Sequence, residues 1–320
     1  MALGVADIAL VSPLGLSPSE HVFFARAEVS PHSSGAFIDK DGQALPIHDC
    51  PWIPASRPRA SRIRLLAKQA LGRAGVAAGK VPIYLIGPEA AIARDADLVR
   101  FLALSGHRIE KTFTGSAAHV AAFVAAEKAL QDEGEIVVLA VDSLLSRQEI
   151  EAWYDVRYSG FTRNPLPPSE GAAAMRLLTT TRAPLAGKIH AFASAQSEAT
   201  DDNDLMTDGV ALTRVLGNLR LPAQVPLVVG PRDVDALRMR DFHLASVRHH
   251  QKLERAEMPS FEGRVGNFGS AGGLMSAVFA MAWLRHGLAL PEGIDKQIAV
   301  AWARSRNGTV SAVLVGDEQS

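Results

Sequence analysis

The chain has 320 residues, of which 48% are hydrophobic, a formal net charge of −1 and a single cysteine, Cys50. This length and hydrophobic content suffice for a large core in one large or two smaller domains. The near-neutral charge argues against nucleic acid or an anionic membrane as the main partner. One cysteine excludes an internal disulfide and a cysteine-rich metal site, so we predict a cytoplasmic protein with no metal and no cofactor.

The first third of the chain alternates strand and helix patterns. The predicted elements are a strand at residues 5–11, a helix capped by Ser17 with Pro18 at its first position, a helix from Ile63 to Gly72 or Gly75, and a strand at residues 81–87.

A helix with almost no polar side chains follows. Between residues 116 and 126 the only polar residues are Ser116 and His119, so the helix has no solvent-facing side and should be buried on most sides. It leads to an apolar strand at residues 136–141, and the segment 166–178 ends in another.

The second half repeats this order. The predicted elements are strands at residues 188–195 and 225–230, helices at 205–216 and 233–244, a second helix without a polar face at 268–284, and strands at 297–303 and 310–315. The uncharged stretch 266–284 is barely long enough to span a membrane, and its Gly, Ala and Ser content favours a tightly packed core helix of a soluble protein. The repetition predicts an α/β protein of two similar halves, residues 1–182 and 183–320, with two sheets enclosing a central helix pair in five α-β-α-β-α layers.

Four segments resemble the thiolase-like superfamily and, within it, the β-ketoacyl synthases. "ALVSPLG" at the start, "GSAAHVAAFVAAEKAL" followed by "GEIVVLAVDSL", "PPSEGAAAMRLL", and "GNFGSAGGLMSAVFAM" are similar to motifs of that family and cover the chain nearly end to end. The resemblance implies the five-layer thiolase-like fold. It also implies chemistry in which a cysteine at the start of the first buried helix holds an acyl chain as a thioester, while His and His or His and Asn stabilise an enolate.

The positions that match these catalytic groups are altered. Gly115 stands at the cysteine position, with Thr114 and Ser116 beside it. Gly230 stands where the first histidine is expected, before Pro231 and Arg232. We therefore identify no confident catalytic residue at Gly115, Ser116 or Gly230.

Two further positions lie before the second buried helix. Glu262 replaces a lysine of the family motif, and Asn267 matches the synthases that use asparagine there. Asparagine also caps helices well, and we favour capping over catalysis for Asn267.

Other reactive side chains have structural interpretations. We interpret Cys50 as non-catalytic and His119 as a core histidine, although His119 could share a helix face with Ser116. His243, His249 and His250 lack a further ligand at metal-binding spacing.

Three functions stay open. The first is a catalytically degenerate synthase-like protein that acts as a scaffold, adaptor or non-catalytic partner. The second is an acyltransferase that uses Ser116 or no covalent intermediate, and the third is an unrelated small-molecule binding protein. The resemblance implies a homodimer or a heterodimer with an intact synthase, with acyl-carrier protein or acyl-CoA as further partners. We expect the apolar strand at residues 136–141 to be the sheet edge at which two subunits join.

Overall fold

The computed structural model describes residues 2–29, 31–38, 42–93, 96–158, 166–179, 185–201, 206–231, 235–287 and 297–317. The elements of the first half are β1 (Leu3–Val11), α1 (Pro18–Arg26), α2 (Arg59–Arg73), β2 (Gly79–Gly87), α3 (Glu89–Ile92), α4 (Asp97–Leu104), β3 (His107–Thr114), η1 (Ser116–Ala118), α5 (His119–Glu133), β4 (Glu135–Ser143), α6 (Arg147–Tyr158) and β5 (Glu170–Thr179). The predicted cap of α1 is confirmed, since the Ser17 hydroxyl accepts from the Glu20 amide and the Glu20 side chain returns to the Ser17 amide.

The second half contains β6 (Gly187–Gln196), α7 (Val210–Asn218), β7 (Leu227–Val229), α8 (Ala236–Arg248), α9 (His250–Leu253), α10 (Phe261–Val265), η2 (Gly269–Ala271), α11 (Gly272–His286), β8 (Ile298–Arg304) and β9 (Thr309–Gly316). The boundary that we expected between residues 182 and 183 lies outside the described residues.

Within the described residues, nine strands form one hydrogen-bonded sheet in the order β3-β2-β4-β5-β1-β6-β9-β8-β7. The two predicted sheets are therefore joined, through the short antiparallel pairing of β1 with β6 from Leu3↔Ile189 to Val5↔Gly187. Each side of that junction repeats one pattern. In the first half β2 runs parallel to β4, which is antiparallel to β5, itself antiparallel to β1. In the second half β7, β8, β9 and β6 follow the same sequence of directions.

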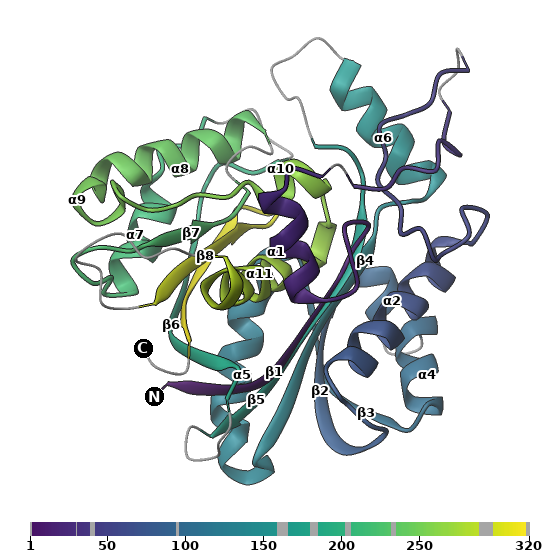
Figure 1. Cartoon of the computed structure of the whole chain (residues 1–320), viewed down its shortest axis with the longest axis horizontal. Helices are drawn as coiled ribbons and strands as arrows, with labels where there is room; N and C mark the ends of the chain where they lie inside the picture. The colour runs from purple at the N-terminus through teal and green to yellow at the C-terminus, as the bar shows by residue number, and fades with distance from the viewer. Residues whose placement is uncertain are drawn as a thin grey trace.

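The layers follow from the way apolar side chains gather into clusters. One core contains α5, α11 and the inward faces of both halves of the sheet. A second core packs α2 and α4 on the outer face of the first half, and a third packs α7 and α8 on the outer face of the second. Figure 1 shows this order, with α2 and α4 on one side, α7 and α8 on the other and α11 between them. The predicted five-layer arrangement is confirmed.

The two central helices differ in burial. Every residue of α11 from Gly272 to Leu284 is buried, as its sequence predicts. The prediction for the first helix is wrong on one side, because α5 exposes Ala121 and 38% of Val124. No helix of the described residues combines the length and the apolar character needed to cross a membrane.

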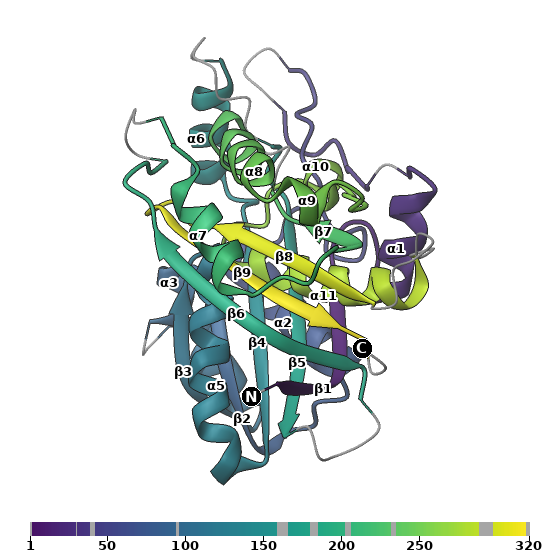
Figure 2. The same cartoon turned by 90° about the vertical axis from the view of Figure 1, so that its left-hand side faces the viewer.

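The predicted sheet edge is also wrong. β4 lies inside the sheet between β2 and β5, and its apolar run is explained by burial on both faces. The edge strand of the first half is β3, and that of the second half is β7. β3 was not predicted from the sequence because its charged residues Arg108, Glu110 and Lys111 hide the strand pattern. In Figure 2, β3 lies beside α5.

The beginnings of α5 and α11 touch at a glycine. A Cβ atom on Gly273 would overlap the carbonyl oxygen of Ser116 and the ring of His119. Only a glycine fits between the two helices at this point, because a side chain would force the helix starts apart.

Replacement of Gly273 by alanine should lower the free energy of unfolding by at least about 2 kcal/mol, because the new methyl group meets backbone and an enclosed ring. Urea denaturation measures this. Gly217→Ala is the matched control, since a Cβ at Gly217 in α7 meets nothing within 4 Å, and a gain of up to about 1 kcal/mol is expected there. Equal stability of wild type and Gly273→Ala would contradict the tight helix contact.

Candidate functional site

A cavity of about 500 Å³ opens where the starts of α5 and α11 meet. Both halves contribute polar and apolar side chains to its walls. The lining includes Arg59, Gly115, Ser116, Asp142, Leu144, Glu149, Trp153, Asp201, Asp235, Leu237, Arg238, Glu262, Asn267, Arg304 and Arg306. The structure thus brings together most of the positions that the sequence motifs single out.

Each half caps the buried helix of the other half. The Asp142 carboxylate, near the end of β4, accepts a hydrogen bond from the Ser270 amide at the start of η2 (2.9 Å). The Ser305 hydroxyl, directly after β8, accepts one from the Ala117 amide in η1 (2.8 Å). These contacts satisfy amides that lack partners at the start of a helix, and they tie the halves together at the cavity.

Gly115 precedes η1 with a φ of 90° and ψ of 154°. A Cβ atom there would lie 2.7 Å from the Ser305 hydroxyl oxygen, in a backbone conformation that favours glycine. The next residue, Ser116, donates its hydroxyl hydrogen to the Arg304 carbonyl oxygen (2.7 Å). The start of α5 therefore holds no side chain at Gly115 and an engaged hydroxyl at Ser116, while Thr114 is an exposed residue at the end of β3.

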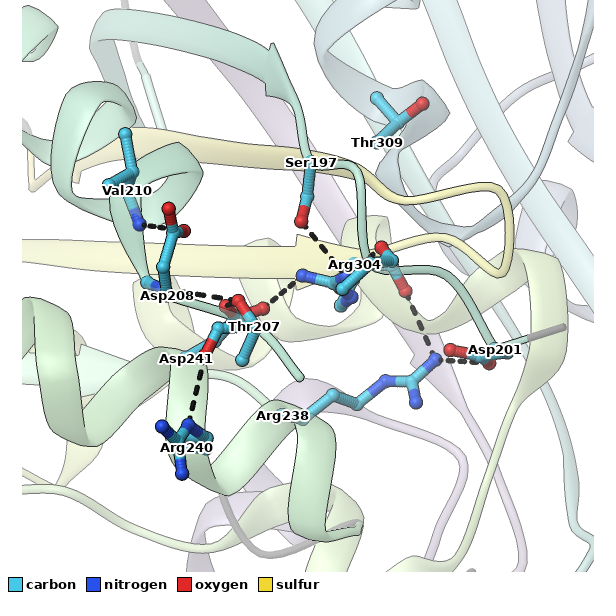
Figure 3. Close-up of polar contacts among 12 residues, drawn as sticks. Ser197, Asp201, Thr207, Asp208, Val210, Arg238, Arg240, Asp241, Arg304 and Thr309 are labelled. Atoms are coloured by element: carbon cyan, nitrogen blue, oxygen red, sulfur yellow. Dashed lines mark hydrogen bonds and ion pairs between the residues drawn. The ribbon is translucent and has the colours of Figure 1, made fainter. Parts of the chain in front are cut away.

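The Arg304 backbone is fixed by its own side chain. Its guanidinium is fully buried, ion-paired with Asp241, and donates to the Ser197 hydroxyl (3.3 Å) and the Ala199 carbonyl. Figure 3 shows this group, with Arg238 reaching the Arg304 carbonyl from the other side. The ion pair holds the carbonyl that accepts from Ser116.

Glu262 is a buried acid in the cavity wall. Its residue is 7% exposed, and a Cβ on Gly272 would lie 2.9 Å from its carboxylate oxygen, so the glycine makes room for it. Burial raises the pKa of Glu262 to about 7, against the lowering effect of Arg238. Glu262 is therefore an acid that changes charge near neutral pH.

Asn267 and Gly230 differ in their relation to the cavity, since Asn267 lines it and Gly230 does not. The Asn267 side-chain oxygen accepts from the Gly269 amide (2.8 Å), so Asn267 stabilises the turn before η2, whose N-cap residue is Phe268 and not Asn267. Gly230 does not line the cavity, since a Cβ there would overlap the Trp302 ring in the outer core, whereas the adjacent Pro231 does line it. Arg232 lies outside the described residues.

Cys50 and His119 are both buried, and neither forms a nucleophile–base pair with a described residue. Cys50 lies in the outer core, its amide donates to Glu170 (2.8 Å), and burial raises the pKa of its thiol. Glu170 in turn pairs with buried Arg62 (Nε to Oε2, 2.7 Å), which explains the polar residue within "PPSEG". His119 contacts the carbonyl of Ser116 (Nδ1 to O, 3.2 Å) and not its hydroxyl, and burial lowers the pKa of His119 to about 4.

The three C-terminal histidines do not converge. His243 is exposed, His249 contacts the Thr213 carbonyl (3.0 Å) and His250 pairs with Glu254 (3.3 Å). Across the described ranges, no three His, Cys, Asp or Glu side chains form a group that could hold a metal ion.

Sequence reasoning missed the ionic groups of the cavity. Arg59 pairs with Asp142 (3.0 Å) and Glu149 (2.9 Å), and Arg238 pairs with Asp201 (3.0 Å) and Asp235. One sequence signal pointed to them. Asp142 follows the apolar run of β4, and polar residues at strand ends commonly face a site.

No family model and no curated protein matches the chain, whereas solved structures match it over nearly its whole length. The ketosynthase from module 6 of the bacillaene synthase of Bacillus subtilis 168, in a cysteine-to-serine mutant form, aligns with a TM-score of 0.75 at 13% identity, over 100% of this chain and 72% of that chain. The ishigamide ketosynthase/chain length factor aligns with a TM-score of 0.72 at 14% identity, over 99% of both chains. This chain has the thiolase-like fold.

A third match is a complex. AntDE:AntF, a type II polyketide synthase acyl-carrier protein with its ketosynthase bound to the hexaketide, aligns with a TM-score of 0.72 at 13% identity, over 98% of this chain and 99% of that chain. At these identities the matches establish the fold that the sequence motifs predict.

The raised pKa of Glu262 predicts a pH-dependent stability. Unfolded Glu262 ionises near 4.5 and the folded one near 7, so the folded state binds more protons between these values and the free energy of unfolding falls as pH rises through them. Burial also raises the pKa of Asp142 and Asp241, so these carboxyl groups likewise make the free energy of unfolding fall as pH rises. Burial lowers the pKa of His21 and His119 to about 4, which gives the opposite slope below pH 6.5.

The effect of Glu262 is isolated by the difference between wild type and Glu262→Gln. From pH 4.5 to 7.5 this difference should move by about 3 kcal/mol in favour of the variant, as measured by urea denaturation. Glu254→Gln, at a more exposed carboxylate (42%), should show a much smaller change. A pH-independent difference for Glu262→Gln would contradict the buried, protonated acid.

Proposed function

We propose that this chain is a ketosynthase-like protein that does not condense acyl units and acts by binding, as a non-catalytic partner, scaffold or adaptor of an active synthase. The observation that carries this proposal is the start of α5, where Gly115 leaves no room for a thiol-bearing side chain. The fold shared with a ketosynthase/chain length factor supports the partner role.

The surroundings of Gly115 also support a non-condensing role. Gly230 lies against Trp302, the Asn267 side-chain oxygen accepts from the Gly269 amide, and Glu262 brings an acid to the wall where a condensing enzyme would stabilise an enolate. A carboxylate close to a developing enolate raises the barrier to its formation.

The alternative is an acyltransferase that uses Ser116, because its hydroxyl lies at the cavity and at the start of a buried helix. A serine nucleophile needs a base within hydrogen-bonding distance. The Ser116 hydroxyl instead donates to the Arg304 carbonyl, and the neighbouring His119 ring contacts the Ser116 carbonyl.

The two functions are separated by incubation of the purified protein with acyl-CoA or acyl-carrier protein, followed by intact-mass spectrometry. We expect no adduct, because no thiol lines the described part of the cavity and the Ser116 hydroxyl is hydrogen-bonded to the Arg304 carbonyl oxygen. A stable acyl adduct that disappears in Ser116→Ala would replace the proposed function with the acyltransferase. An adduct on buried Cys50 would mark unfolding, because that thiol is 0% exposed.

The partner should join this chain along β3 and the exposed side of α5. β3 has one strand neighbour, β2, among the described residues, and its free edge adjoins α5, which exposes Ala121 and Val124. The charges of β3 protect such an edge from indiscriminate pairing, so the partner must match them. Val138, by contrast, is fully buried between Tyr84 and Met175, so Val138→Lys would test folding and not assembly.

We expect a homodimer, or a heterodimer once an intact synthase is added, by light scattering. Val124→Lys should dissociate it and leave the chain folded, as judged by circular dichroism, because this side chain is 38% exposed in the single chain. Leu104→Lys, at an 83% exposed position on α4, should leave it intact. A monomer under both conditions would contradict the partner role.

A further inference from the structure

The acid side of the cavity carries more negative than positive charge. The guanidinium of Arg238 forms ion pairs with Asp201 (3.0 Å) and with Asp235. Both acids line the cavity together with Arg238. Glu262 is the third acid at this wall, and none of the described Arg or Lys side chains forms an ion pair with it. Burial and, to a smaller extent, the negative charge of Asp235 raise the pKa of Glu262, whereas Arg238 lowers it.

Among the described residues, the opposite wall supplies no cation that is free to pair with these acids. The Arg59 guanidinium is held by Asp142 at 3.0 Å and by Glu149 at 2.9 Å. The Arg304 guanidinium points away from the cavity to Asp241, and only its carbonyl faces Ser116. Arg306 is exposed, so its charge is screened by solvent.

We propose that the cavity binds a small ligand with a protonated amine, placed against Glu262 and Asp235, and that it discriminates against carboxylate ligands. This inference rests on the proposed function, because a condensing enzyme would have to admit an anionic extender unit to the same space. A cation at this point supplies the counter-charge that Glu262 lacks, whereas an anion would face three carboxylates around one guanidinium.

The rest of the ligand is apolar. Leu144, Trp153 and Leu237 line the same cavity, and its volume of about 500 Å³ is that of an ordinary small-molecule site. A short alkyl chain attached to the amine can therefore leave water together with the head group. The ligand class is an amphipathic amine.

Three probes with one chain and different head groups test this: n-hexylamine, 1-hexanol and hexanoate. At pH 8, calorimetric titration should show that n-hexylamine binds at least about tenfold more tightly than hexanoate, with 1-hexanol between them. Equal affinities for the amine and hexanoate, or no binding of any probe, would overturn the proposal.

The pH dependence of n-hexylamine binding tests the charge of Glu262 directly. Arg238 and Asp235 face it from α8, and on the helix starts Ser116 is uncharged and His119 is neutral because burial lowers its pKa to about 4. Since Glu262 must ionise to pair with the amine, affinity for n-hexylamine should rise roughly tenfold from pH 6 to pH 8. An affinity that falls over this range would contradict the assignment.

Glu262→Gln keeps the shape of the side chain and removes its charge. In Glu262→Gln, n-hexylamine should lose both its tighter binding relative to 1-hexanol and its pH dependence. Glu254→Gln, at an exposed position between α9 and α10, should keep both. Retention of both in Glu262→Gln would sink the proposal. A failure of this inference is distinguishable from a failure of the proposed function, because acyl adducts report on covalent chemistry and these titrations on equilibrium binding alone.

Discussion

The close contact between the starts of α5 and α11 is the constraint on which the rest of the structure depends. Gly273 lets the Ser116 carbonyl and the His119 ring approach α11 directly, and Gly272 leaves space for the Glu262 carboxyl group. Because both helices begin at one place, the amides at their starts and the ends of β4 and β8 converge there. The cavity exists because these elements meet, and not because of any one motif.

The reciprocal caps explain why two repeated halves behave as one unit. Asp142 reaches from the first half to η2, and Ser305 reaches from the second half to η1. The continuous sheet adds a second connection through β1 and β6. A change at the cavity therefore affects both halves.

The chain shares the fold of the matched ketosynthase structures, and its central cavity is lined by ionic groups. Paired guanidinium and carboxylate groups, Arg59 with Asp142 and Arg238 with Asp235, stand where both halves meet. A fold does not by itself fix the chemistry of its site, so the function must be argued from these side chains.

The sequence by itself determined the elements and their order wherever the pattern was apolar. β1, β5, β8, β9 and the buried α11 followed from runs of hydrophobic residues, the cap at Ser17 from its side chain, and the absence of a thiol at position 115 from identity alone. It also predicted that Ser116, Glu262 and Asn267 would gather near one place, through motif resemblance. Only the tertiary structure decided which strand forms the edge and which charges meet. The apolar run of β4 fits an edge or an interior strand equally well, and pairing on both sides decides between them. The link between Arg59 and Asp142 spans 83 positions and leaves no local pattern. Long-range ion pairs and the free side of α5 depend on how elements pack, which periodicity within a single helix or strand does not encode.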